Sequence, residues 1–404
     1  MRILHTVQLY YPHLGGSEEV VKQISERFAQ RGHDVTVATG YDPTRDFDTW
    51  NGVTIKQFKV SGNLVEGIEG ETEAYLDFVL NGHFDVVMNY AAQVWSSDLL
   101  FPHLQRIAAP KVFVPCGYAA LYDHRYREYF AQLPAYLREY DALVYMSPNY
   151  RDKKFSDQHG LSKGHIIPNG ASEEEFGQQH LGFRQRYGIE TEYMLLCVAN
   201  FYPSKGHKLV IDAFQGLGRK DTTLVIVGRV PDGQRRWFQL YYLVCRSYHL
   251  TCRIKAWASR RIKILEDVPR PWAVSAFQEA DLFVFGSEIE CSPLVILEAL
   301  ASRTPFVSTD CGDVGDHAEF GEVVENPEAM ARSINGLLND DERRSILAHD
   351  GHAHWRRYHT WETITDQYEQ LYRELGARLP GCCSQPGDAW RSGECSHVPD
   401  SSCC

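Results

Sequence analysis

The chain has 404 residues, of which 44% are hydrophobic and 23% are charged, and its formal net charge is −12. These values are ordinary for a folded globular protein and exclude a disordered, collagen-like or coiled-coil chain. The length predicts two or three domains, and the negative charge argues against nucleic acid as a partner, because the phosphate backbone would be repelled.

The cysteines and the apolar stretches predict the cellular environment. No stretch approaches 18 consecutive apolar residues, and Arg2 is followed by only two apolar residues before His5. Neither a membrane-spanning helix nor a secretory leader is therefore predicted, and the expected location is the cytoplasm. Six of the 11 cysteines lie singly in the body of the chain, as is typical of reduced core residues.

The first part of the chain alternates between strands and helices. A strand over 2–7 leads through a loop into a helix over 18–31 and then into a strand over 34–38. Such a unit predicts a parallel sheet with right-handed crossovers. Further strands are predicted over 84–88, 111–114 and 142–146.

A second series of the same kind begins near residue 194, so we expect two Rossmann-like domains in tandem. Its predicted strands lie over 194–199, 222–227, 262–265, 282–285 and 305–308. The expected boundaries are an N-terminal domain over 1–172, a linker over 173–190, a C-terminal domain over 191–358, a helix over 359–376 that crosses back to the first domain, and a disordered tail over 377–404. The tail holds five cysteines, and a metal site or a lipidation site there is the alternative to a tail without function.

The glycines after the first strand form the first candidate ligand-binding element. Gly15 and Gly16 let the backbone approach a ligand, and the free N–H groups of the helix start can meet an anion. A plain strand-to-helix turn capped by Ser17 is the alternative. No G-x-G-x-x-G pattern follows this strand, which argues against a nicotinamide cofactor.

A lysine and two glutamates follow strands of the second series. Lys205 stands beside Gly206 at the start of a helix, where its charge suits a phosphate. Glu290 and Glu298 flank another helix start, and two carboxylates at this spacing can accept hydrogen bonds from different hydroxyls of one ligand. The alternative is that these side chains are solvated surface charges.

The helix between these glutamates is expected to begin with Ser292 as its cap and Pro293 in its first turn. The backbone N–H groups of Leu294 and Val295 would then be free to face a diphosphate.

These motifs, in this order, resemble those of glycosyltransferase family 4, the retaining nucleotide-sugar transferases of GT-B fold. The resemblance covers about residues 1 to 375. The residues that carry it are Gly15-Gly16-Ser17-Glu18, Ile167-Pro168-Asn169-Gly170, Ser204-Lys205-Gly206-His207 and the segment from Glu290 to Glu298. It implies two Rossmann-like parallel-sheet domains that face a central cleft, with the acceptor on the first and the nucleotide-sugar on the second.

The resemblance also implies a role for each matched position. Glu298 would bind the ribose hydroxyls, Glu290 would hold the donor sugar at the reacting side, and Lys205 would bind the diphosphate. Gly16 would contact phosphate or developing charge through its backbone, and Cys116 would line the acceptor side. The other expected donor-binding positions are Asn200, Gly228, Ser292, Leu294 and Val295. No aspartate pair for a divalent ion is evident, so neither a metal nor another cofactor is expected.

Two positions depart from the family pattern. Asn200 stands where many relatives have an arginine for the diphosphate, and Cys116 stands where many have a histidine. Three histidines are candidates for the missing role: His13, His103 and His124. A nucleotide-binding scaffold that has lost catalysis and a GT-B sugar-nucleotide epimerase are therefore the alternatives to transfer from a UDP-sugar, or less favoured a GDP-sugar, to a glycan or lipid-linked acceptor.

A basic, aromatic segment over 234–263 could rest weakly on an anionic membrane surface. Between residues 232 and 265 there are eight basic residues and one acid. The alternative is an ordinary helix on the sheet with a charged outer face, whose core stripe would consist of Trp237, Leu240, Tyr241 and Val244.

Overall fold

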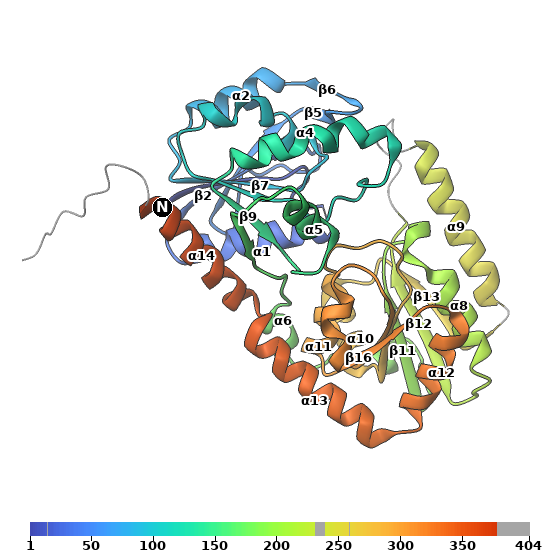
Figure 1. Cartoon of the computed structure of the whole chain (residues 1–404). Helices are drawn as coiled ribbons and strands as arrows, with labels where there is room; N and C mark the ends of the chain where they lie inside the picture. Colours follow the sequence, from blue (N-terminus) through green and yellow to red (C-terminus); the bar gives the residue numbers. More distant parts are fainter. Residues whose placement is uncertain (14, 231–238, 258, 378–404) are drawn as a thin grey trace, which may run out of the picture.

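The computed structural model describes residues 1–13, 15–230, 239–257 and 259–377 of the chain. They form two α/β domains, each built on its own parallel sheet (Figure 1). The tail that the sequence predicts lies outside the described residues from 378 onward, as does Trp237.

The N-terminal sheet has eight strands in the order β10-β9-β8-β7-β1-β2-β4-β3. Neighbouring strands are parallel except for β3 and β4, and β5 and β6 form a separate antiparallel hairpin. The strands are β1 (Arg2–Thr6), β2 (Asp34–Gly40), β3 (Thr49–Trp50), β4 (Val53–Phe58), β5 (Val60–Asn63), β6 (Gly67–Gly70), β7 (Val86–Tyr90), β8 (Lys111–Val114), β9 (Ala142–Tyr145) and β10 (Gly164–Ile166).

The C-terminal sheet has six parallel strands in the order β13-β12-β11-β14-β15-β16. They are β11 (Tyr193–Val198), β12 (Thr222–Gly228), β13 (Ile262–Glu266), β14 (Leu282–Phe285), β15 (Phe306–Thr309) and β16 (Gly321–Val324). In each domain the strand order reverses beside the first strand, between β1 and β7 and between β11 and β14. Ligands of such sheets bind in the crevice at this reversal, beyond the carboxyl ends of the strands.

Helices cover both faces of each sheet, because alternate residues of the buried strands point to opposite sides. The described helices are α1 (Gly16–Gln30), α2 (Thr72–Asn81), α3 (Trp95–Asp98), α4 (Arg127–Arg138), α5 (Arg151–Gln158), α6 (Glu173–Phe176), α7 (Phe183–Arg186), α8 (His207–Gly216), α9 (Gln239–Trp257), α10 (Arg270–Glu279), α11 (Leu294–Ala301), α12 (Pro327–Leu338), α13 (Asp341–Tyr358) and α14 (Trp361–Ala377). On one face of the N-terminal sheet, Ile3 packs with α1 and α14, and on the other face Leu4 packs with α2 and α4.

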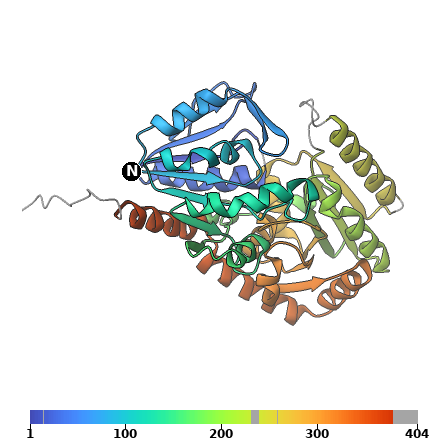
Figure 2. The ribbon, with the colours of Figure 1, turned by 45° about the horizontal axis from the view of Figure 1, so that its top comes forward.

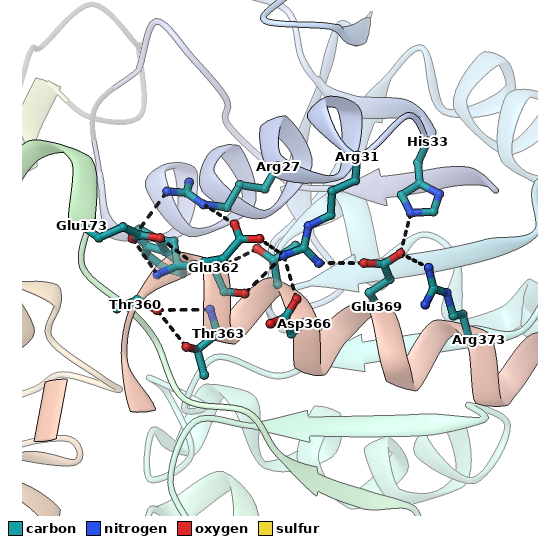
Figure 3. A network of polar contacts seen from close by, with 12 residues as sticks. Arg27, Arg31, His33, Glu173, Thr360, Glu362, Thr363, Asp366, Glu369 and Arg373 are labelled. Atoms are coloured by element: carbon teal, nitrogen blue, oxygen red, sulfur yellow. Dashed lines mark hydrogen bonds and ion pairs between the residues drawn. The ribbon is translucent and has the colours of Figure 1, made fainter. Parts of the chain in front are cut away.

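The last helix, α14, packs on the N-terminal domain although α13 before it packs on the C-terminal one (Figure 1). Its buried face includes Trp361 and Tyr372, which lie in the same core as α1. Ion pairs join its other side to α1, among them Arg31 to Asp366 at 2.8 Å and Arg31 to Glu369 at 2.7 Å (Figure 3). The two domains are therefore connected twice, by the segment before α6 and by the segment between α13 and α14.

Helix α9 lies at the outer edge of the C-terminal domain in both ribbon views (Figures 1 and 2). The predicted core position Val244 is wrong, since this side chain is 46% exposed. The buried positions are instead Cys245, Tyr248, Cys252 and Ala256, at helical spacing. Helix α9 carries apolar residues on two faces, and packing against α8 selected the other one. The side chains of Leu240 and Tyr241 lie outside the described part.

Within the described ranges, no helix is both long enough and apolar enough to span a bilayer.

Candidate active site

Two loops at the carboxyl ends of β11 and β14 bring Lys205 and Glu290 together. The Lys205 ammonium lies 2.5 Å from Glu290 Oε1, and both side chains are largely buried, at 25% and 13% exposure. The loops fit because residue 206 is a glycine: its φ is +64°, and a Cβ there would lie 1.7 Å from the carbonyl oxygen of Gly286. The predicted cation and carboxylate thus lie at the strand-order reversal of the C-terminal sheet.

Helix α11 places Glu298 in a second ion pair. Arg270 Nη1 at the start of α10 lies 2.7 Å from Glu298 Oε1, and the same guanidinium binds Glu175 Oε2 at 2.7 Å. Burial raises the pKa of the Glu298 carboxyl, and the Arg270 charge opposes that rise.

The start of α11 differs from the prediction at one position. The cap residue is Pro293, not Ser292, and no side chain caps the helix. The carbonyl oxygen of Ser292 accepts a 3.0 Å hydrogen bond from Asn169 Nδ2 of the N-terminal domain. Leu294 and Val295 are the first helical residues, and their N–H groups belong to the first turn, where an α-helix supplies no acceptor.

The N-terminal wall of the site is the loop after β8. Cys116, Gly117 and Tyr118 all have positive φ, at 57°, 87° and 49°. Consecutive left-handed residues are costly and concentrate at functional loops. The loop meets the second domain at Cys291: a Cβ on Gly117 would lie 2.8 Å from the Cys291 Cβ.

A thiol contact and a hydroxyl contact join the two walls. The Cys116 and Cys291 side chains share a hydrogen bond, which lowers the pKa of the Cys116 thiol. The Tyr150 hydroxyl donates to the carbonyl oxygen of Glu290. Gly16 is the first residue of α1, and a Cβ there would meet no atom within 4 Å, so its backbone is open to approach.

The remaining predicted positions lie at the end of β12. A Cβ on Gly228 would lie 2.1 Å from the carbonyl oxygen of Ala199, so only glycine fits between these strands. Asn200 Oδ1 accepts a hydrogen bond from the backbone N–H of Arg229 at 3.2 Å. The Arg229 guanidinium pairs with Asp267 at 2.7 Å and is 49% exposed.

Sequence reasoning missed two arginines near the site, Arg229 and Arg270. Neither belongs to a motif, and Arg270 stands between two prolines at the start of α10. A signal was nevertheless present for Arg229, because it directly follows the strand that ends at Gly228, on the edge where ligands bind. Of the alternative histidines, His124 points to solvent at 94% exposure, and His13 pairs with Asp42 at 2.9 Å.

Two Rossmann-like domains with charged loops at facing strand ends define a GT-B fold. Residues 192–340 match the model of the family "Glycosyl transferases group 1". The match covers most of the C-terminal domain, and together with relatives that are named glycosyltransferases it indicates an enzyme of this kind.

Known proteins agree with this assignment. The chain is 35% identical over 122 residues to a D-inositol 3-phosphate glycosyltransferase of Corynebacterium urealyticum. This alignment covers 29% of this chain and 28% of that protein. It is 24% identical over 401 residues to an uncharacterized glycosyltransferase of Methanocaldococcus jannaschii. This alignment covers 92% of this chain and 98% of that protein. A solved structure of Anabaena HepE in complex with UDP and glucose has the same fold, with a TM-score of 0.73, 17% identity, and coverage of 93% of this chain and 100% of that one.

Proposed function

We propose that this protein transfers a sugar with retention of configuration from a nucleoside diphosphate donor, UDP in preference to GDP, to a glycan or lipid-linked acceptor. The observation that carries the proposal is the Lys205–Glu290 pair, 2.5 Å apart at the strand-order reversal of the domain that matches the family. The pair holds a cation for a diphosphate and a carboxylate for a sugar at one place.

The chemistry follows from an exchange of partners at Lys205. When the donor enters, a phosphate oxygen replaces Glu290 on the Lys205 ammonium, and the carboxylate turns to the sugar. Lys205 and the first-turn N–H groups of Leu294 and Val295 then stabilise the charge that develops on the leaving diphosphate. The freed carboxylate favours the oxocarbenium-like centre of the sugar. These residues supply the positive charge themselves, so the proposed transfer needs no divalent metal.

Two further contacts suit the nucleotide and the acceptor. The Glu298 carboxylate, oriented by Arg270, would accept hydrogen bonds from ribose hydroxyls. Gly16 and Cys116 lie on the opposite domain, where the acceptor would approach the sugar. The UDP in the HepE structure supports a uridine donor here.

The test is ligand-induced thermal stabilisation. UDP, GDP and ADP are each added to the wild type in the presence of a chelator, since a ligand that binds only the folded state raises the melting temperature. We expect UDP to give the largest shift, and Glu298→Gln to lose most of it. Glu342→Gln, an exposed carboxylate on α13, is the matched control and should keep the full shift.

An acceptor screen with UDP-sugars then separates transfer from the alternatives. Release of UDP with a glycosylated product supports transfer. UDP binding without any sugar release supports a scaffold, and a change in the donor sugar without an acceptor supports an epimerase. The absence of any diphosphate effect on the wild type would remove the basis of the proposal.

We also propose that the outer face of α9 contacts an anionic membrane, where a lipid-linked acceptor would lie. Besides Val244, its exposed apolar side chains are Leu243, Leu250, Ile254 and Trp257, the last 89% exposed. They follow one another at helical spacing, with Arg246 and Arg253 between them, as in an interfacial helix. Co-sedimentation with phosphatidylserine vesicles should drop strongly in Trp257→Glu and stay unchanged in Tyr122→Glu, an equally exposed aromatic of the N-terminal domain. Equal binding of both variants would contradict this contact.

A further inference from the structure

Three histidines that are distant in sequence meet beside the segment that crosses between the domains. His317 lies in the short 3-10 helix η5 (Val314–Phe320), His354 lies in α13, and His359 directly follows α13. One ring nitrogen of each lies within 4.8 Å of the other two. Among the residues with described positions, this is the one group of three or more that could hold a metal ion.

Two of the ring nitrogens have the spacing of ligands to one metal ion. His354 Nε2 and His359 Nε2 are 3.2 Å apart, which is close to the ~3.4 Å between two nitrogens bound tetrahedrally to one zinc ion. His359 Nδ1 lies 3.0 Å from the carbonyl oxygen of Asn169 and donates to it. That bond fixes the tautomer with a lone pair on Nε2, as the outer partner of a metal-bound histidine does.

His317 supplies an independent observation. Its side chain is 4% exposed, and its Nδ1 has no hydrogen-bond partner. Buried polar atoms are rarely left without a bonding partner, so the unpaired Nδ1 of His317 indicates that a partner is missing from the cluster. A bound cation would supply it.

Two carboxylates near the cluster compensate an added positive charge. Asp316 interacts electrostatically with His317, and Glu319 does so with His354, so two carboxylates offset the charge of a divalent ion.

We propose that His317, His354 and His359 bind one Zn²⁺ ion as a three-nitrogen site with a fourth position for water. Three imidazoles without a carboxylate ligand favour zinc over magnesium or calcium. The ion would join η5 to the end of α13. Both segments reach the other domain or the connection to it: Asp316 accepts hydrogen bonds from Ser147 and Asn149 Nδ2, at 2.5 and 2.8 Å, and His359 binds Asn169.

The ion would therefore hold the place where the domains are connected. This site is separate from the proposed sugar transfer and does not depend on it.

Metal binding by the full chain tests the proposal. The protein is stripped with a chelator, dialysed, and titrated with Zn²⁺ by calorimetry, and in parallel with Co²⁺ by visible absorption. We expect the wild type to bind one equivalent of Zn²⁺ more than His354→Gln and to melt at a higher temperature with the ion. Losing an outer partner already weakens zinc sites about 10–100-fold, so losing a ligand should weaken this one by at least ~100-fold.

Matched variants keep the result interpretable. His354 is the least buried of the three, so its replacement disturbs folding least, and His317→Gln provides a second variant. His352→Gln is the control on the same helix, since its Nδ1 binds the carbonyl oxygen of Ala301 outside the cluster. It should bind Zn²⁺ as the wild type does.

The cobalt spectrum distinguishes this site from the cysteines after residue 381. Thiolate ligation adds a sulfur-to-cobalt charge-transfer band, and an all-imidazole site does not. A wild type that binds no Zn²⁺, or that binds it equally in His354→Gln, would overturn the proposal.

Discussion

Glu369 is one of the α14 carboxylates that attach this helix to the N-terminal domain, through Arg31 and His33 (Figure 3). It accepts hydrogen bonds from Arg31 at 2.7 Å, His33 at 2.9 Å and Arg373 at 2.5 Å. Its side chain is 11% exposed, as is that of His33, while Arg31 is 19% exposed and Arg373 is 69% exposed. The first two contacts are therefore shielded from water, and the third is not.

These exposures set the size of the effect of Glu369→Gln. The exposed Arg373 pair contributes at most about 0.5 kcal/mol. The two shielded contacts to charged or polar partners contribute about 1 to 1.5 kcal/mol each after a discount for remaining solvent. Arg31 keeps Asp366 and Glu362, so it is not left unpaired. We expect the variant to be about 2 kcal/mol less stable, or roughly 4–8 °C lower in the melting temperature of a domain of this size.

The pH dependence follows from the same contacts. Burial alone would raise the pKa of Glu369, but the hydrogen bonds from His33 and Arg31 outweigh it, and the net shift is downward. A carboxyl group with a depressed folded-state pKa stabilises the protein above its ordinary pKa and loses that contribution as the pH falls through the folded value. The difference between wild type and variant should therefore be full at pH 7 and vanish in strong acid.

The assay is thermal unfolding combined with hydrogen exchange. Exchange should accelerate across α14 in Glu369→Gln and stay unchanged in α11, which belongs to the other domain. Glu374→Gln is the control, because Glu374 is exposed and accepts only from Gln370 at 3.0 Å. Equal stability of the two variants would refute the reasoning that this network attaches α14.

Two further predictions concern the site. Gly206→Ala places a Cβ against the carbonyl oxygen of Gly286 at a positive φ, so it should lower the free energy of unfolding by at least about 2 kcal/mol and abolish the thermal stabilisation by nucleotide. Gly218 also has a positive φ but open space around it, so Gly218→Ala should lower the free energy of unfolding by only about 1 kcal/mol and leave nucleotide binding intact. Burial raises the pKa of Asp313 to about 7, so the folded state keeps a proton that the unfolded chain has lost, and stability falls as the pH rises from about 4 to 7. Asp313→Asn removes this penalty, so the stability of the variant relative to the wild type should rise by about 2–3 kcal/mol between pH 5 and pH 8. A difference in melting temperature that stays constant across that range would contradict the assignment.

The periodicity of the sequence predicted five strands of each sheet and missed β3, β4, β10 and β16. The strands β11 and β14 are short continuous apolar runs, and the lysine and glutamate motifs lie in the loops that follow them. Because parallel strands end at one edge of a sheet, the sequence already placed Lys205 and Glu290 at the same edge. That they are neighbours there was decided by the strand order, which brings β14 back beside β11.

Packing between distant segments decided what local sequence could not. Helix α9 has apolar residues on two faces, and only contact with α8 showed that Cys245 and Cys252 are buried rather than Val244. Ser292 has the chemistry of a cap, yet it does not cap α11, and its carbonyl oxygen binds Asn169, 123 residues earlier.

The same holds for contacts that no motif announces. Arg270 reaches Glu298 only when α10 and α11 lie side by side. The three histidines lie 37 and 5 residues apart along the chain, a spacing without metal-site character, and they meet because α13 folds back on η5. Local sequence determined the elements and the edge where ligands bind, whereas long-range packing chose the partners of each charged side chain.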